Sequence, residues 1–332
     1  MKRVLGFVQR YDVLVVFALL FAVNAIWQPG VFLLPENLRN LVNQNVAVGI
    51  IALGMTLVIA TGGIDLSVGS LMALSAAISV LALDKLIAGG GSEATASAVA
   101  ILVCVGAGLV LGVANGLMVA FGRVAPFVAT LVGLVAYRSL CMALADGGEI
   151  RSSSSQVFPS LGEGGVPLPF VHIAGGGPLI ITWGMLLFVA VAIVASLMLN
   201  RMVFGRYSVA TGSNEQAARY AGVNTRAAKF WAYAALGLFT GIAGVTVETR
   251  MNSVASSSMG LYYELDAIAA VVIGGTSLRG GSGRIWGTVV GVLLLGVITN
   301  MLVTLGVSVY WQGVVKGAII LFAALMQRGR AE

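Results

Sequence analysis

Residues 59–70 read IATGGIDLSVGS, in which the motif GGIDLSVGS (62–70) interrupts an otherwise apolar stretch. Residues 274–282 read GGTSLRGGS and repeat the pattern G-G-x-x-L-x-x-G-S 212 residues later. Matched glycine-interrupted segments in the two halves of a membrane protein are typical of helix breaks beside a transport path. The pattern therefore predicts a set of helix-break or gate positions, namely Gly62, Gly63, Asp65, Gly69, Gly274, Gly275 and Gly281.

The composition excludes a water-soluble globule. Of the 332 residues, 58% are hydrophobic and 10% are charged, and the mean hydropathy is +0.98, which predicts an integral membrane protein. The 44 glycines agree with this, because small residues let transmembrane helices approach closely. Apolar runs near the bilayer-spanning length of about 20 residues occur at 12–28, 41–60, 66–86, 97–121, 126–145, 179–200, 228–247, 264–275, 284–304 and 308–326.

These runs predict an all-α polytopic membrane protein with about ten transmembrane helices. The chain forms one transmembrane domain, residues 1–332, in which the two glycine-interrupted segments are a weak internal repeat. The first run is interpreted as a retained span rather than a signal peptide, because many more spans follow it. The eighth run is short and ends in the second glycine motif.

The basic residues predict the orientation, because lysine and arginine concentrate on the cytoplasmic side of membrane proteins. With ten crossings and a cytoplasmic N-terminus, the outer segments hold only Arg39, Lys85, Arg151 and Arg250. The cytoplasmic segments hold Lys2, Arg3, Arg10, Arg123, Arg201, Arg206, Arg219, Arg226, Lys229, Arg279, Arg284, Arg328 and Arg330. We therefore expect a multi-pass protein with both termini in the cytoplasm. Its pI of 9.6 reflects this topology and does not require binding to nucleic acid.

Three segments between the spans are long enough to carry function, namely the predicted outer loops 146–178 and 249–262 and the predicted cytoplasmic loop 201–228. The outer loop 146–178 is rich in Gly, Ser and Pro and is predicted to be too polar and too broken for helix. In the cytoplasmic loop 201–228, Ser213 and Gln216 form a capping box that predicts a short helix over Asn214–Tyr220, with Gly222 as its stop. The small alanines of this helix suit a groove on a partner protein. The alternative is a linker that lies on the lipid surface.

The motifs of common catalytic sites do not occur in the chain. It has no G-x-x-x-x-G-K-[ST] phosphate loop, no H-E-x-x-H and no G-x-S-x-G. The lone His172 has no metal-type ligand near it in sequence, and Cys104 and Cys141 lie inside apolar spans, so we predict neither a metal site nor a disulfide. No catalytic residue is assigned. An energy-coupled role then takes its energy from an ion gradient or from a separate ATPase.

The polar side chains within the spans are candidates for a transport path. Asp65 alternatively caps the helix that follows it, and Arg138 alternatively extends toward the outer surface. Lys316 needs a partner or a water-filled cavity, because an unpaired charge in a membrane is costly. Neutral side chains suit an uncharged polyol and equally suit contacts between helices. The candidates, apart from Asp65, are Asn45, Asn115, Phe127, Thr130, Arg138 and Lys316.

Four stretches together resemble a known family. They are IATGGIDLSVGS (59–70), APFVATL (125–131) with the later Arg138, GSNEQAARYAGVNTRAAK (212–229) and ELDAIAAVVIGGTSLRGGSG (264–283). These stretches resemble the permease subunits of bacterial ABC importers for monosaccharides, the ribose, galactofuranose and autoinducer group. The resemblance covers nearly the whole chain. Val132 departs from it, since Thr-Leu-Gly is expected to be contiguous there.

The resemblance implies a transport subunit in a bacterial inner membrane that is not itself an enzyme. It implies pairing with a second permease copy, either identical or a paralogue, and binding to a cytoplasmic ABC ATPase that carries the ATP and magnesium. A periplasmic binding protein delivers the sugar, and this chain holds no cofactor. The cytoplasmic helix is then similar to a coupling helix, with the ATPase contact at Asn214, Glu215, Ala217, Ala218, Arg219 and Gly222.

Several other functions remain open from the sequence. Within the importer class, a permease for branched-chain amino acids is the nearest alternative substrate assignment. An ion-coupled secondary transporter would have no use for a capped cytoplasmic helix. A membrane-embedded enzyme or a passive channel fits less well, because the spans lack paired catalytic groups. On the predicted topology both glycine motifs lie toward the cytoplasm, which favours structural hinges near an inner gate over a sugar site.

Overall fold

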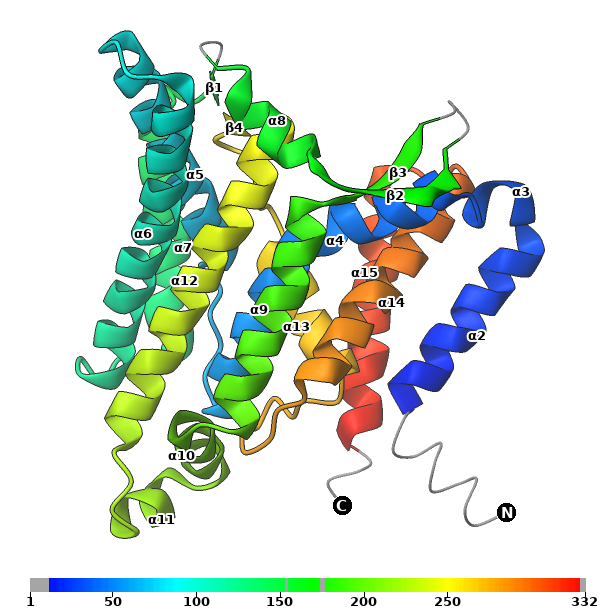
Figure 1. Ribbon diagram of the computed structural model, residues 1–332. Helices are drawn as coiled ribbons and strands as arrows, with labels where there is room; N and C mark the ends of the chain where they lie inside the picture. The colour runs from blue at the N-terminus through cyan, green and yellow to red at the C-terminus, as the bar shows by residue number, and fades with distance from the viewer. Residues whose placement is uncertain (1–11, 153–154, 174–176, 329–332) are drawn as a thin grey trace.

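The computed structural model describes residues 12–152, 155–173 and 177–328. These residues form a bundle of long helices that run between two ends of the molecule (Figure 1). Helices α10 (Val203–Ser213) and α11 (Glu215–Tyr220) lie at one end, termed here the α11 end. Helix α8 (Val157–Glu163) and two small sheets lie at the opposite end.

Each of the predicted apolar runs contains a helix. Among the described residues, seven helices are long and apolar enough to cross a membrane: α4 (Pro35–Ala60), α5 (Val68–Ala88), α6 (Glu93–Ala120), α7 (Pro126–Leu144), α9 (Trp183–Asn200), α12 (Thr225–Met251) and α14 (Ile285–Thr304). The other runs form α2 (Asp12–Trp27), α13 (Tyr263–Ile273) and α15 (Val309–Arg328). With 16 and 11 residues, α2 and α13 are shorter than a usual span. The all-α polytopic fold is confirmed.

Helix α4 is the centre of the bundle. In its most apolar stretch 78% of the residues are buried, against 28% in α7 and in α9. It packs against α9, α12, α13 and α14, so protein covers it on several sides. A helix that is apolar all round is suited to this position.

Glycines bring α6 and α12 into backbone contact. A Cβ atom added to Gly108 would lie 2.6 Å from the carbonyl oxygen of Gly237, and one added to Gly112 would lie 2.6 Å from the Gly237 Cα. Gly241 likewise lies against the backbone of α6, at Cys104 and Val105. No larger residue fits these positions without moving a helix, which explains why this pair of helices packs so closely.

The loop 146–178 is more ordered than its composition predicts. It contains β1 (Glu149–Arg151), which pairs with β4 (Ser253–Ala255), then α8, and β2 (Gly165–His172), which pairs with β3 (Pro178–Thr182). The prediction of no helix here is wrong. The carboxylate of Glu93, on α6, accepts hydrogen bonds from the backbone N–H groups of Gln156 and Val157. The side chain of Phe158, on α8 itself, is fully buried. These stabilising contacts are distant in sequence, so local composition does not reveal them.

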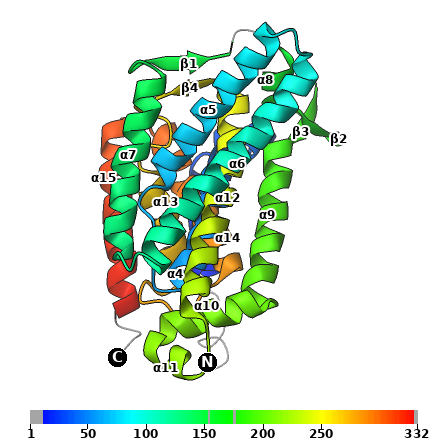
Figure 2. The same ribbon diagram turned by 90° about the vertical axis from the view of Figure 1, so that its left-hand side faces the viewer.

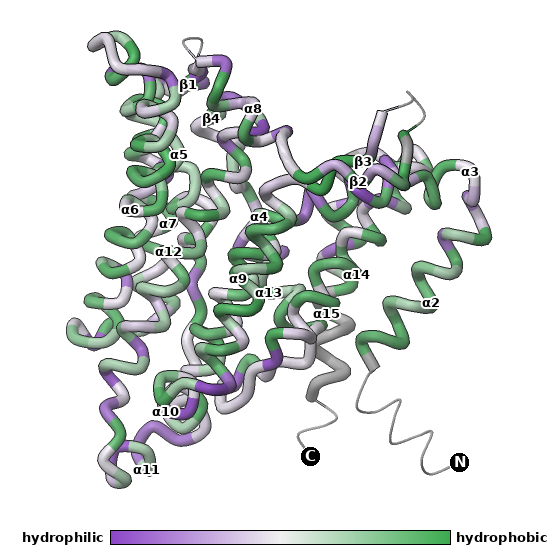
Figure 3. Tube along the Cα trace, in the orientation of Figure 1, coloured by the Kyte–Doolittle hydropathy of each residue, from purple (hydrophilic) through white to green (hydrophobic). Residues whose placement is uncertain are grey.

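The two ends of the bundle differ in polarity from its middle. Figure 3 shows hydrophobic residues along the helices and hydrophilic residues gathered around α10 and α11 and around α8 and β1. The first described residue of α2 and the last of α15 both lie at the α11 end (Figure 1). Lys2, Arg3, Arg10 and Arg330, which contribute to the predicted orientation, lie outside the described residues.

Candidate functional site

The loop 201–228 contains the predicted helix, α11, but the cap of this helix differs from the prediction. Asn214 is the N-cap, and its Oδ1 accepts a hydrogen bond from the Ala217 N–H at 2.9 Å. Ser213 is instead the last residue of α10, where its hydroxyl donates to the Val209 carbonyl at 2.9 Å. The capping-box assignment is wrong because the sequence did not reveal α10. Gly222 follows the helix with φ +81°, as expected of a glycine stop.

Charged side chains attach α11 to the start of α12. Glu215 pairs with Arg219 and with Lys229, each at 2.6 Å, and Arg219 also donates to the Thr225 hydroxyl. Burial alone raises the pKa of Glu215, but the hydrogen bonds from Lys229 and Arg219 outweigh it and hold that pKa below its ordinary value. Glu215 therefore stays ionised at neutral pH and fixes the orientation of α11.

Most of the predicted contact residues of α11 are exposed, namely Asn214, Ala217, Arg219 and Gly222. Ala218 is only 6% exposed, which leaves little of its surface for the predicted contact with the ATPase. Gln216 and Tyr220, which were not among the predicted residues, are also exposed, and Tyr220 is 92% exposed.

The two glycine motifs meet at the α11 end. The Gly281 N–H donates to the Ala60 carbonyl at 3.1 Å, and a Cβ on Gly280 would lie 2.9 Å from the Gly62 Cα and 3.0 Å from the Gly212 Cα. Gly62, Gly280 and Gly281 have φ of +82°, +85° and +76°. This glycine junction, formed by residues 60–62, 212–213 and 280–281, joins the end of α4, the end of α10 and the loop that follows α13.

Beyond the junction the two motifs diverge. Gly274 and Gly275 end α13, and Gly281 lies in the loop before α14. In the first motif, Gly63 lies beside the Tyr233 hydroxyl, and the chain from 61 to 67 is unwound until α5 begins at Val68. Gly69, the counterpart of Gly281, lies inside α5 against the Gly260 carbonyl. The two copies of the motif are therefore alike in structure only at their first glycines, which in each copy follow the end of a helix.

Asp65 lies in the unwound segment and is 1% exposed. Its Oδ1 accepts hydrogen bonds from the N–H and hydroxyl of Ser67, at 2.8 and 2.6 Å, and its Oδ2 accepts from the Asn115 amide at 3.0 Å. The Tyr137 hydroxyl donates to Asn115 at 2.8 Å. Asp65 thus stabilises the turn before α5 and ties it to α6 and α7, which is close to its predicted capping role.

The structure does not bring the neutral path candidates together. Asn115 and Thr130 are fully buried inside the chain, and Thr130 donates to the Pro126 carbonyl of its own helix. Asn45 donates to the Leu41 carbonyl at 2.8 Å. Phe127 is 58% exposed on the outside of α7. Within one chain these side chains hold helices together or face outward.

The charged candidates lie on one face. Helix α13 packs between α5 and α15, and α5 packs in turn against α7 (Figure 2). Lys316, on α15, forms an ion pair with Asp266 at 3.0 Å. The partner that was predicted for this charged side chain therefore lies in the first turn of α13. Arg138, on α7, donates to the Ser256 carbonyl at 2.8 Å and lies within electrostatic range of Glu264. We term Arg138, Glu264, Asp266 and Lys316 the charged cluster.

Sequence reasoning did not assign Glu264, Asp266 and Tyr262 to the path. The acids begin the short apolar run 264–275, and a run of ordinary length would have placed them at the membrane surface. Because α13 has only 11 residues, its first turn lies within the bundle (Figures 1 and 2). Tyr262 precedes it with φ +66° and is 61% exposed. The shortness of that run was the signal available in the sequence.

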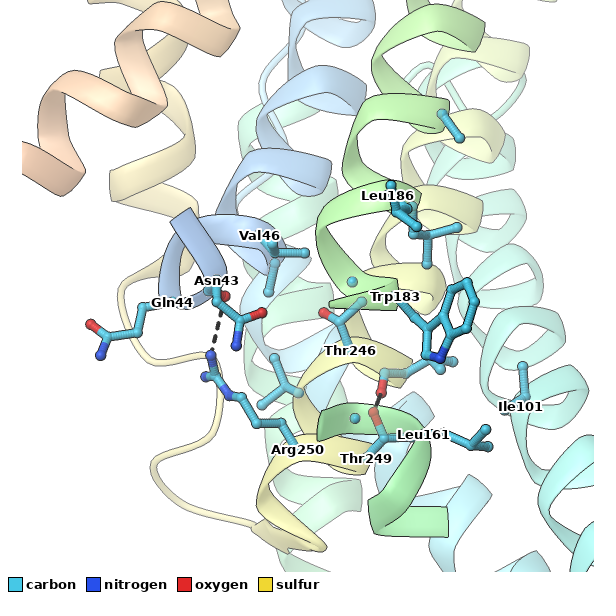
Figure 4. A pocket seen from close by; sticks show the side chains of 17 residues that line it. Asn43, Gln44, Val46, Ile101, Leu161, Trp183, Leu186, Thr246, Thr249 and Arg250 are labelled. Carbon is cyan, nitrogen blue, oxygen red and sulfur yellow. Dashed lines mark hydrogen bonds between the residues drawn. The ribbon is translucent and has the colours of Figure 1, made fainter. Parts of the chain in front are cut away.

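A separate cavity of about 490 Å³ lies between α4, α9 and α12 (Figure 4). Its wall is mainly apolar and includes Trp183. Its polar side chains are used within the fold, because Arg250 donates to the Asn43 carbonyl at 3.1 Å and Thr182 donates to the Asn43 side chain at 2.8 Å. The charged cluster, whose groups are partly exposed, is the better candidate for contact with a polar solute.

Comparison with known proteins identifies the family. Residues 37–324 match the family model described as the permease component of branched-chain amino acid transport systems. The chain belongs to this family of permease components. It is 38% identical to the ribose import permease protein of Bacillus subtilis, over 98% of this chain and 95% of the relative.

Other relatives also match over most of their length. The chain is 40% identical to the ribose import permease protein of Escherichia coli K12, over 94% of this chain and 92% of the relative. It is 34% identical to the galactose/methyl galactoside import permease protein of the same strain, over 98% of this chain and 96% of the relative. No solved structure matches the chain.

Proposed function

We propose that this chain is the membrane-spanning permease subunit of an ABC importer for a ribose-like monosaccharide. The observation that carries the proposal is the identity of 38–40% with ribose import permeases over nearly the whole chain. A xylose transport permease protein at 31% identity adds a second pentose. The family description names branched-chain amino acids, but these relatives are named for sugars. A monosaccharide is therefore the favoured substrate.

The α11 end is proposed to face the cytoplasm. Arg123, Arg206, Arg226 and Lys229 belong to the loops and helix ends at this side. The opposite end includes Lys85 and Arg151. By the positive-inside rule both termini are then cytoplasmic, and the two small sheets face the periplasm of a bacterial inner membrane, where a sugar-binding protein docks.

The sugar path is proposed to lie between two copies of the chain, across the face formed by α7, α5, α13 and α15. Val132 and Val135 on α7 are 56% and 58% exposed, and Val314 on α15 is 59% exposed, which is apolar surface available for a second copy. The charged cluster lies on the same face. Carboxylates and an arginine bind sugar hydroxyls by charge-assisted hydrogen bonds, and the exposed ring of Tyr262 suits the apolar face of a sugar.

The glycine junction is proposed to transmit movement from the ATPase to the path. Closure of the ATPase subunits on ATP displaces α11, which is continuous with α10 through Asn214. Gly212 at the end of α10 lies against the Ala60 carbonyl and the Gly281 N–H. Residues 274–284 lead directly from α13, so a shift of the junction moves the helix that carries Glu264 and Asp266.

Uptake by proteoliposomes tests this function. Vesicles that contain the chain, its cognate ATPase and binding protein, with ATP on the side of the ATPase, are expected to accumulate labelled ribose. A hundredfold excess of unlabelled leucine is expected to leave the rate unchanged. Ribose uptake by the chain alone under an ion gradient would instead establish a secondary transporter, and accumulation of leucine in place of ribose would establish an amino acid permease.

Replacement of Lys316 tests the proposed path. Lys316→Met leaves Asp266 without its partner and is expected to lower ribose uptake about tenfold, because a partly buried charge that loses its partner is costly. The exchange Asp266→Lys with Lys316→Asp restores the ion pair and is expected to recover part of the rate. Lys85→Met, at the exposed outer end of α5, is the matched control. Wild-type uptake by Lys316→Met would remove the pair from the path.

A further inference from the structure

A second cavity, of about 440 Å³, lies at the α11 end. The end of α6 and the turn 121–125 form one side of it, and Pro126 at the start of α7 contributes to the rim. The other side comes from α11 and the first turns of α12. Its charged lining residues are Arg123, Glu215, Arg219, Arg226 and Lys229.

The cavity has an excess of positive charge. Its single lining carboxylate, Glu215, is shared between Arg219 and Lys229. The side chains of Arg123 and Arg226 form no hydrogen bond or ion pair with any other described residue. Two guanidinium groups thus remain available for an anion, and guanidinium binds phosphate oxygens in a bidentate manner.

The start of α7 also favours an anion at this position. Helix α7 begins at Pro126 and has 19 residues, and its first turn contributes the positive end of the helix dipole to the cavity rim. This feature adds to the arginine pair and acts on the same side of the cavity.

The surroundings place the cavity at the level of lipid headgroups. Phe121 and Trp231 are 55% and 58% exposed, and the ring of Phe230 contacts both of them edge-on at 5.9 and 5.1 Å. Tryptophan is enriched at the boundary between acyl chains and headgroups. Phe127 and Val128, on the first turn of α7, are likewise exposed, at 58% and 49%.

We propose that this cavity binds the phosphate headgroup of an anionic phospholipid from the cytoplasmic leaflet. Arg123 and Arg226 contact the phosphate, and the acyl chains lie along the apolar surface of Phe121, Phe127 and Val128. An acidic segment of a partner protein fits less well, because it would leave this apolar rim uncovered. The lipid thereby contacts both α7 and the base of α11.

Native mass spectrometry of the purified full chain, exchanged into detergent with phosphatidylglycerol or phosphatidylcholine, tests the proposal. Each arginine near an anionic lipid contributes about a fivefold gain in association, so Arg123→Gln with Arg226→Gln is expected to weaken retention of phosphatidylglycerol about 30-fold. Retention of phosphatidylcholine is expected to be unchanged. The control variant, Arg201→Gln with Arg206→Gln, removes two exposed arginines outside the cavity and is expected to bind like the wild type.

Equal retention of phosphatidylglycerol by the cavity variant and by the wild type would overturn the proposal. Displacement of the lipid by millimolar inorganic phosphate would show a site for free phosphate, which also contradicts it. A cavity variant that keeps the lipid and loses only its ATPase would reassign the arginines to the protein interface. The thermal unfolding midpoint of each variant in phosphatidylcholine confirms that it is folded. None of these readouts depends on sugar transport.

Discussion

Replacing Tyr220 with alanine is expected to weaken the binding of the permease to its ATPase about 30-fold or more. Tyr220 ends α11 and is 92% exposed, so it contributes little to the packing of the chain itself. Exposed tyrosines of this kind are enriched among interface hot spots, where truncation costs about 2 kcal/mol or more. The reduced affinity is measured with the purified proteins, and ribose uptake is expected to fall in parallel.

The chain offers a matched control for this variant. Tyr310, at the start of α15 and the opposite end of the bundle, is 91% exposed, and Tyr310→Ala makes the same chemical change there. It is expected to bind the ATPase like the wild type. If Tyr220→Ala and Tyr310→Ala bind equally well, α11 is not the docking helix. Ala218→Glu is unsuitable for this test, since Ala218 is buried and its replacement disturbs the loop.

The variant Gly237→Val is expected to disrupt the fold. Gly237 lies at the closest approach of α6 and α12, where a Cβ would lie 2.5 Å from both the Gly108 carbonyl oxygen and the Gly112 Cα. A valine forces the two helices apart, and overpacking of this kind costs about 3 kcal/mol. The expected result is a lower unfolding temperature and a larger aggregated fraction in size-exclusion chromatography.

Gly106→Val on α6 is the control for the helix contact. A Cβ on Gly106 meets no heavy atom within 4 Å, so the valine enters open space on α6, the helix against which Gly237 packs. Valine in place of glycine has the same intrinsic effect on helix formation at both positions. At Gly106, however, it leaves the contact between α6 and α12 unchanged. Equal stability of the Gly237 and Gly106 variants would contradict the role given to the glycine contact.

The membrane helices were predictable from the sequence because their signal is local. A run of about 20 apolar residues is stable only in a bilayer or a deep core, so run length alone predicts most of the fold. Helix α11 was found for a similar reason, since its cap and its glycine stop lie within nine residues of each other. Helix α8 was missed because the backbone N–H groups at its start donate to the carboxylate of Glu93, more than sixty residues away.

The candidate site was predictable only in part. The sequence required a partner for Lys316 but did not identify Asp266, 50 residues away on another helix. It placed Asp65 ahead of a helix, yet the contact with Asn115 depends on how α6 packs. The contact between the two glycine motifs was likewise not predicted, because a repeat in sequence does not determine whether its copies touch.

The glycine junction has a mechanical consequence. Its contacts run from backbone to backbone, through the Gly281 N–H and the Ala60 carbonyl and through the adjoining Cα atoms. A side chain can change rotamer and absorb a small displacement, whereas directly touching main chains cannot. The junction is therefore a stiff linkage, and a shift of α10 reaches α4 and the loop after α13 with little loss of amplitude.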